Sequence, residues 1–119
     1  MSQGNSYTAA QLNLTNVFQD AASATVVTQT PVGLVVVLFQ CYVALHSISN
    51  AIEVKLVRGS TDVATRTLSN VAEIHIPVFF IDSGATASTS TVYKVQARNQ
   101  AGAGGNITER EIIAIELAL

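Results

Sequence analysis

The residues best placed for chemistry in this sequence are Glu73 and His75, which one residue separates in the segment EIHIP. On a β-strand, residues two apart point to the same face, so these side chains could supply two ligands to a metal ion. A protein zinc site needs three or four ligands, and no HxH, HExxH or cysteine-rich motif accompanies the pair. A solvated or interface contact is the more ordinary role for such a pair, and we expect no bound metal.

The other candidates for chemistry also have ordinary structural explanations. Cys41 is the only cysteine, which excludes an intrachain disulfide, and no basic residue lies near it in sequence, so we expect a core residue and not a nucleophile. The glycine-rich segment at 101–106, AGAGGN, precedes a predicted strand, whereas a phosphate-binding loop needs a helix behind it. Two separated histidines, His46 and His75, are too few for a cupin-like metal enzyme. The sequence therefore predicts no catalysis and no cofactor.

Composition limits the possible partners. The 119 residues suit one domain with one core, because a chain of this length buries roughly 65% of its unfolded surface. Only 12% of the residues are charged and the net charge is −2, so the basic surface of a nucleic-acid-binding protein is absent. With 49% hydrophobic residues and so little charge, we expect partners to cover much of the surface.

Alternation of apolar and polar residues predicts β-strands throughout the chain. Short alternating segments are separated by turn-forming residues, and the segment at 51–68 contains the turn GSTD, which is typical of a hairpin. This pattern predicts an all-β fold, an antiparallel β-sandwich of the jelly-roll type in a single domain. We expect that domain at residues 24–119, preceded at 1–23 by an N-terminal arm with a possible first strand. The predicted strands are 9–18, 24–31, 33–45, 51–68 as a hairpin, 73–82, 91–99 and 110–119.

The most apolar segment is GLVVVLFQCYVAL, at residues 33–45. It is too short to cross a membrane as a helix, which takes about 20 apolar residues, and no basic residue precedes it as in a signal peptide. Its Val and Phe content predicts a strand that is apolar on both faces, and a second subunit or the N-terminal segment must cover one of them. For the subunit alternative, the expected interface residues are Val35, Val37, Phe39, Phe79 and Ile81.

The C-terminal third carries a resemblance. The strand TVYKVQARN, the loop AGAGGN, the dipeptide IT and the final strand EREIIAIEL follow one another in an order that resembles the last hairpin of trimeric jelly-roll domains of the tumour-necrosis-factor and complement-head type. The ending Ile113-Ala114-Ile115-Glu116-Leu117 is similar in particular to the versions in bacteriophage virion proteins, and the hairpin at 51–68 resembles the middle hairpin of that family.

The resemblance implies a non-enzymatic virion structural protein. We expect a capsid decoration, or cement, protein that is made in the host cytoplasm, binds the major capsid protein on the outside of an assembled phage head as a homotrimer, and stabilises the head. No nucleic acid or membrane is expected as a partner. The uncharged N-terminal segment suits a capsid-binding arm, with Ser2, Gln3, Asn5 and Tyr7 as contacts. The alternative is a tail-fibre or head-fibre tip that recognises a host receptor or glycan through loops at 58–62, 83–91 and 100–107.

Overall fold

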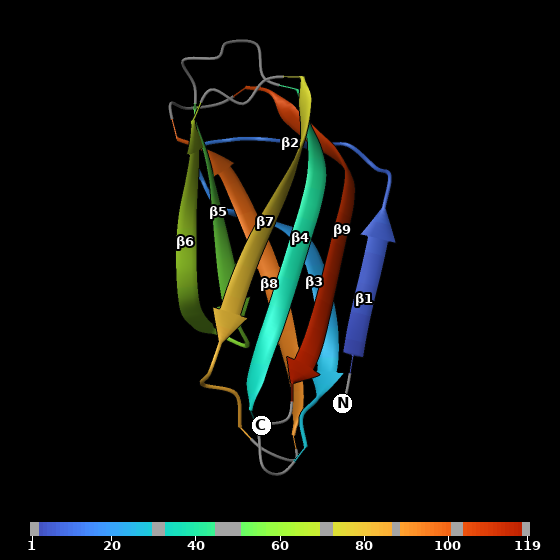
Figure 1. Cartoon of the computed structure of the whole chain (residues 1–119). Coiled ribbons are helices and arrows are strands. Elements are labelled where there is room, and N and C mark those ends of the chain that lie inside the picture. Colours follow the sequence, from blue (N-terminus) through green and yellow to red (C-terminus); the bar gives the residue numbers. More distant parts are fainter. Residues whose placement is uncertain are drawn as a thin grey trace.

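The computed structural model describes residues 3–29, 33–44, 51–69, 73–86, 89–100 and 104–117. These residues form β-strands in two antiparallel sheets that pack face to face, with the sheet that contains β4 in front in Figure 1. None of them forms a helix of the length and hydropathy that crossing a membrane requires. The strands are β1 Gln3–Thr8, β2 Leu12–Asn13, β3 Gln19–Val27, β4 Leu34–Ala44, β5 Ala51–Arg58, β6 Thr61–Ser69, β7 Ile74–Asp82, β8 Ser90–Asn99 and β9 Asn106–Leu117.

The strand order is that of a jelly roll. The first sheet has the order β1-β9-β4-β7, with β2 also pairing to β9, and the second has the order β3-β8-β5-β6. The antiparallel pairs β5 and β6, β4 and β7, β3 and β8, and β1 and β9 enclose one another along the chain, as in a long hairpin rolled into a sandwich. The predicted antiparallel β-sandwich of the jelly-roll type is confirmed.

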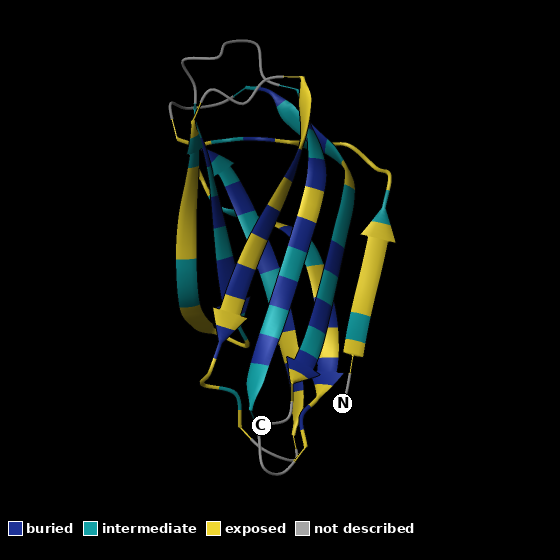
Figure 2. Cartoon of the chain, viewed as in Figure 1, coloured by how far each residue is buried: buried dark blue, intermediate teal, exposed yellow. Residues whose placement is uncertain are grey.

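The core lies between the sheets and follows from the period of two in the sequence. Alternate residues of β4, β5, β7, β8 and β9 point inward and are buried, which gives the banding along each strand in Figure 2. Branched aliphatic side chains dominate, with a few aromatic rings among them. The largest fully buried apolar side chains are Tyr93, Phe39, Phe80, Ile52, Leu56, Ile107 and Ile112.

The N-terminal part of the chain belongs to the sandwich. Residues 3–8 form β1, which pairs along its whole length with β9, and β3 begins at Gln19, so the boundary expected at residue 24 falls inside a strand. A Cβ atom on Gly4 would lie 2.1 Å from the carbonyl oxygen of Thr25, so β1 packs directly against the backbone of β3. The described part of residues 1–23 is therefore not a free arm, and the first strand lies at 3–8, outside the predicted 9–18, where only Leu12–Asn13 form a strand, β2.

Candidate interaction surface

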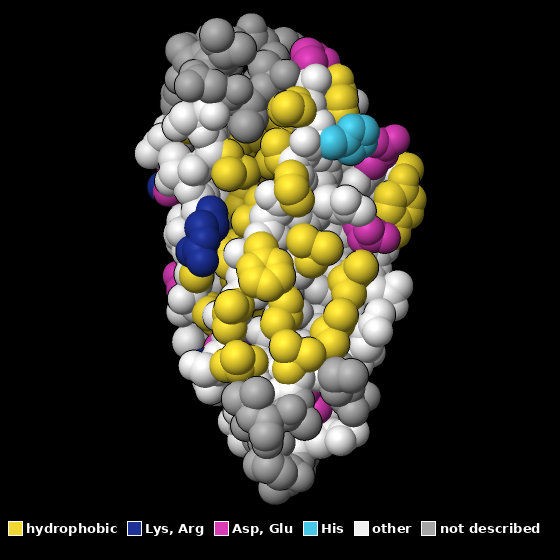
Figure 3. All heavy atoms as spheres, viewed as in Figure 1, with side chains coloured by type: hydrophobic (Ala, Val, Ile, Leu, Met, Phe, Trp, Pro, Cys, Tyr) yellow, Lys and Arg dark blue, Asp and Glu magenta, His cyan; other side chains and the backbone are white. Residues whose placement is uncertain are grey.

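The outer face of the first sheet is apolar across β9, β4 and β7. Strand pairing places the outward side chains in rows: Ile115, Val36 and Ile81 form one row, Ile113, Leu38 and Phe79 the next, and Leu117 pairs with Leu34 beside them. We call these eight side chains the outer patch. Figure 3 shows hydrophobic side chains gathered over the same three strands. Phe79 and Ile81 are each 54% exposed and Leu117 is 37% exposed, while the other five are partly buried.

The outer face of the second sheet is polar and serves as an internal comparison. Its ion pairs join Lys94 to Asp20 at 3.5 Å and Lys55 to Asp62 at 3.4 Å. Arg98 bonds to Glu53 at 2.7 Å, and both Lys55 and Arg98 lie over the ring of Phe18. An antiparallel sheet with one solvated face should have this polar character. The outer patch departs from that rule, and it is the candidate interaction surface among the described residues.

Three of the five residues expected at a subunit interface lie elsewhere. Val35, Val37 and Phe39 have no exposed surface, because their side chains point into the sandwich and pack in its core. They cannot contact another subunit as predicted. Phe79 and Ile81 do lie on the outer face, and their assignment to an interface remains a prediction. The outward residues of β4 are instead Leu34, Val36 and Leu38, together with Gln40 and Tyr42 farther along the strand.

The residues predicted for a capsid-binding arm lie at the rim of the outer patch. Gln3, Asn5 and Tyr7 are exposed on β1, where their register partners on β9 are Ile115, Ile113 and Glu111. They therefore extend the same outward rows with amide and phenol groups. Ser2 lies outside the described residues. The assignment of these residues as capsid contacts remains a prediction. They lie on β1, at one edge of the first sheet.

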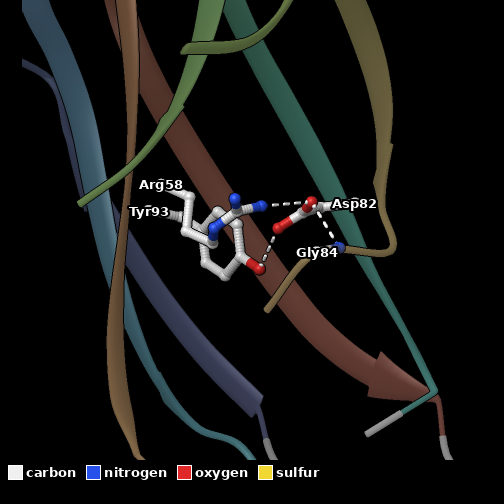
Figure 4. Close-up of polar contacts among 4 residues, drawn as sticks. All are labelled: Arg58, Asp82, Gly84 and Tyr93. Atoms are coloured by element: carbon white, nitrogen blue, oxygen red, sulfur yellow. Dashed lines mark hydrogen bonds and ion pairs between the residues drawn. The ribbon is translucent and has the colours of Figure 1, made fainter. Parts of the chain in front are cut away.

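A buried polar cluster joins the two sheets behind this face. Figure 4 shows the carboxylate of Asp82, at the end of β7, pointing toward Arg58 of β5 and Tyr93 of β8, with Gly84 beside it. One oxygen accepts hydrogen bonds from Arg58 at 2.6 Å and from the Gly84 N–H at 3.0 Å, and the other accepts one from the Tyr93 hydroxyl at 2.6 Å. Because Arg58 and Tyr93 are neighbours across the second sheet, the cluster fixes the end of β7 against that sheet.

Burial and hydrogen bonding shift the pKa values of Asp82, Arg58 and Tyr93. Burial raises the pKa of Asp82, but the hydrogen bonds from Arg58, Tyr93 and Gly84 outweigh it and hold that pKa below its usual value. The hydrogen bond to Asp82 raises the pKa of Arg58. Burial, followed by the bond to Asp82, raises the pKa of Tyr93, so the phenol stays a donor. All three groups have partners and none opens to a cavity, which indicates a structural role.

His75 has a different partner from the one its sequence neighbourhood predicts. Its Nε2 atom lies 2.6 Å from a carboxylate oxygen of Glu109 on β9, whereas Glu73 accepts a hydrogen bond from the Tyr42 hydroxyl at 2.9 Å. Glu73 and Glu109 both have positive φ, at 52° and 50°, and Glu109 lies where the register between β4 and β9 shifts. The described residues contain no group of three or more possible metal ligands. His46 lies outside the described residues.

Cys41 is buried between the sheets, and burial raises the pKa of its thiol to about 12. The thiol is therefore protonated near neutral pH and packs as a small apolar group. No pocket opens among the residues that the structure describes. The feature of the described surface that can bind a partner is accordingly a broad face and not a cleft.

Of the comparisons with known proteins, one similarity to a solved structure bears on the fold. Neither the protein-family models nor the curated proteins contain a match to the sequence. Among solved structures, the chain is similar to part of dimeric latent PorU from Porphyromonas gingivalis, with a TM-score of 0.53 and 11% identity over 99% of this chain. The chain spans 13% of the length of PorU. At that identity the likeness extends to the β fold alone.

A second structure is the CBM22-1 xylan-binding domain of Paenibacillus barcinonensis Xyn10C. It gives a TM-score of 0.37 and 15% identity, with coverage of 97% of this chain and 88% of the other. A TM-score of this size does not indicate a shared arrangement of strands. No property of that domain is carried over to this chain.

Sequence reasoning missed most of the outer patch and the cluster at Asp82. The alternation of Ile113, Ile115 and Leu117 in the last strand does place these residues on one face. Their position beside Leu38 and Phe79 depends on β9 lying next to β4, which alternation within one strand does not specify.

Proposed function

We propose that this chain is a non-enzymatic structural protein of a bacteriophage particle, a decoration protein that binds the outside of the assembled head as a homotrimer and stabilises it. The observation that carries the proposal is the outer patch, a broad apolar face on a protein whose other sheet is normally solvated. A contiguous apolar face of this kind marks an assembly surface more readily than a catalytic one. The resemblance of the last two strand segments to phage virion jelly rolls supports a virion as the setting, although β8 and β9 lie in different sheets and do not form the expected hairpin.

A decoration protein acts through mass action. It binds the assembled lattice of the major capsid protein and not the free subunits, so the lattice gains stability in proportion to occupancy. The exposed amides of Gln3 and Asn5 and the phenol of Tyr7 supply the proposed contacts to the capsid, beside the patch and without net charge. Such contacts depend weakly on salt, because no charged side chain is among them.

The test removes the protein from purified particles and measures two properties. We expect stripped particles to release their genome at a lower temperature and to adsorb to host cells as before, and we expect the purified protein to restore the release temperature when added back. Particles that keep their heat resistance but fail to adsorb would overturn the decoration function and favour a fibre tip. Particles that change in neither property would overturn both.

A further inference from the structure

We infer that the outer patch is an interface between copies of this chain, in which the apolar sheet faces of neighbouring copies meet. The inference rests on the proposed function in one respect: it names the partner that covers the surface on which that function depends. Its basis is the likeness between the two faces of the first sheet. The inward rows Val37, Phe80 and Ala114, and Phe39, Val78 and Ile112, pack against the second sheet. The outward row Leu38, Phe79 and Ile113 is likewise built of branched aliphatic side chains and one phenylalanine.

The geometry of the patch suits another sheet. Its rows run straight across β9, β4 and β7, and the register shift between β4 and β9 lies beyond it, between Gln40 and Tyr42. A regular sheet face packs on another at a spacing of about 10 Å, with the side chains of the two faces interdigitating. With no pocket among the described residues, the surface has no groove shaped for a helix or a peptide.

Charge also allows the face to meet a copy of itself. The eight side chains of the outer patch are uncharged, so two patches bring no like charges together at the centre of the contact. The nearest acidic group, Glu111, lies one row away and accepts a hydrogen bond from Gln40. The opposite sheet would place Lys55, Lys94 and Arg98, each with its carboxylate partner, in such a contact. Self-association through the first sheet therefore requires less desolvation of charged groups.

The area agrees with a core-and-rim interface. With two side chains 54% exposed, one 37% exposed and five partly exposed, the patch presents on the order of 450 Å² of apolar surface per copy. A stable interface buries about 800 Å² per partner, with an apolar core and a polar rim. The outward polar residues Gln40 and Tyr42, which follow the patch along β4, supply part of that rim.

The experiment compares two matched charge substitutions by sedimentation equilibrium of the full chain. Ile81→Asp places a charge in the outer patch, on the edge strand β7. Val27→Asp places the same charge on β3, an edge strand of the second sheet. The two positions are matched in exposure, at 59% for Val27 and 54% for Ile81. Phe79→Lys tests the patch a second time with the opposite charge, and circular dichroism checks that each variant is folded.

We expect the wild type and Val27→Asp to sediment as two or three chains, and the two patch variants to fall to the 12.5 kDa of one folded chain. A monomeric wild type, or patch variants that associate as strongly as the wild type, would overturn the inference. A mass of two chains would support it and overturn the homotrimer. A wild-type monomer that still binds heads and raises their release temperature would leave the decoration function standing. A stable oligomer that does not affect the particle would remove that function and leave the interface.

Discussion

Replacing Arg58 by Met tests whether the buried polar cluster holds the two sheets together. Methionine keeps much of the side-chain length but removes the guanidinium that donates to Asp82 at 2.6 Å. The Asp82 side chain is 4% exposed, so the carboxylate would stay buried with only the bonds from Tyr93 and Gly84. The substitution therefore leaves a charge in the protein interior without its ionic partner.

The expected loss of stability follows from the burial of Arg58 and Asp82. Breaking a buried ion pair from one side costs about 3 to 5 kcal/mol. Because the Arg58 side chain is 24% exposed and water reaches it, we expect the lower part of that range or less, about 2 to 3 kcal/mol of unfolding free energy. The double variant Arg58→Met with Asp82→Asn removes the uncompensated charge, and it should recover part of the loss.

The pH dependence gives a second readout. The pKa of Asp82 in the folded protein lies below its unfolded value of about 3.8, so this group stabilises the fold above pH 4 and loses that effect as the pH falls through the folded pKa. In Arg58→Met, burial raises the pKa of Asp82 without the opposing guanidinium. Protonation then relieves the buried charge, and the stability gap between wild type and variant should narrow below about pH 4.

Urea unfolding at pH 7 and at pH 3.5, followed by circular dichroism, measures both effects. With a slope of roughly 1.5 kcal/mol per molar urea, the expected loss lowers the urea midpoint by about 1.3 to 2 M at pH 7. A loss below about 0.5 kcal/mol would refute the structural role of the ion pair, because surface substitutions produce changes of that size. A gap that is the same at both pH values would show that Arg58 contributes by packing and not by charge.

Three further predictions concern the core, the N-terminal strand and the thiol. Val37→Asp buries a charge in the core at a cost of several kcal/mol, so the variant should be unfolded in its circular dichroism spectrum. The control Ile81→Asp, at an exposed position, should keep the folded spectrum. Gly4→Ala brings a Cβ within 2.1 Å of the Thr25 carbonyl oxygen, so β1 should shift and its amide hydrogens should exchange with solvent faster. The free energy of unfolding should fall by about 1 kcal/mol, and unchanged exchange would contradict the close packing. The thiol of Cys41, with its pKa raised to about 12, should resist a thiol reagent at pH 8 and react once urea unfolds the chain.

The strands with regular alternation could be predicted from the sequence. In 73–82 alternation places Ile74, Ile76, Val78 and Phe80 on one face, and the last three are buried while Ile74, at the start of β7, is exposed. The hairpin at 51–68 turns at Gly59, where φ is 61°. These features depend on residues close in sequence. The jelly-roll class follows from them, because so many short antiparallel strands have few other ways to close a core.

The first strand and the orientation of β4 could not be predicted in this way. The residues of β1 are polar and include Gly4 and Asn5, which disfavour strands, and it forms because β9 offers an edge with which to pair. In β4 both faces are apolar, so composition does not say whether Val37 or Leu38 points inward. The pairing with β7 and β9 decides it, and the cluster at Asp82 likewise depends on contacts between different sheets.

Electron cryo-microscopy of the intact particle tests the central proposal most directly, because it locates the chain and shows what covers the outer face of its first sheet. The proposal predicts groups of three jelly rolls on the outer surface of the head, with Phe79 and Ile81 buried between copies and β1 against the capsid lattice. A position at the tip of a tail or head fibre, or a head-bound subunit whose outer patch faces solvent, would contradict it.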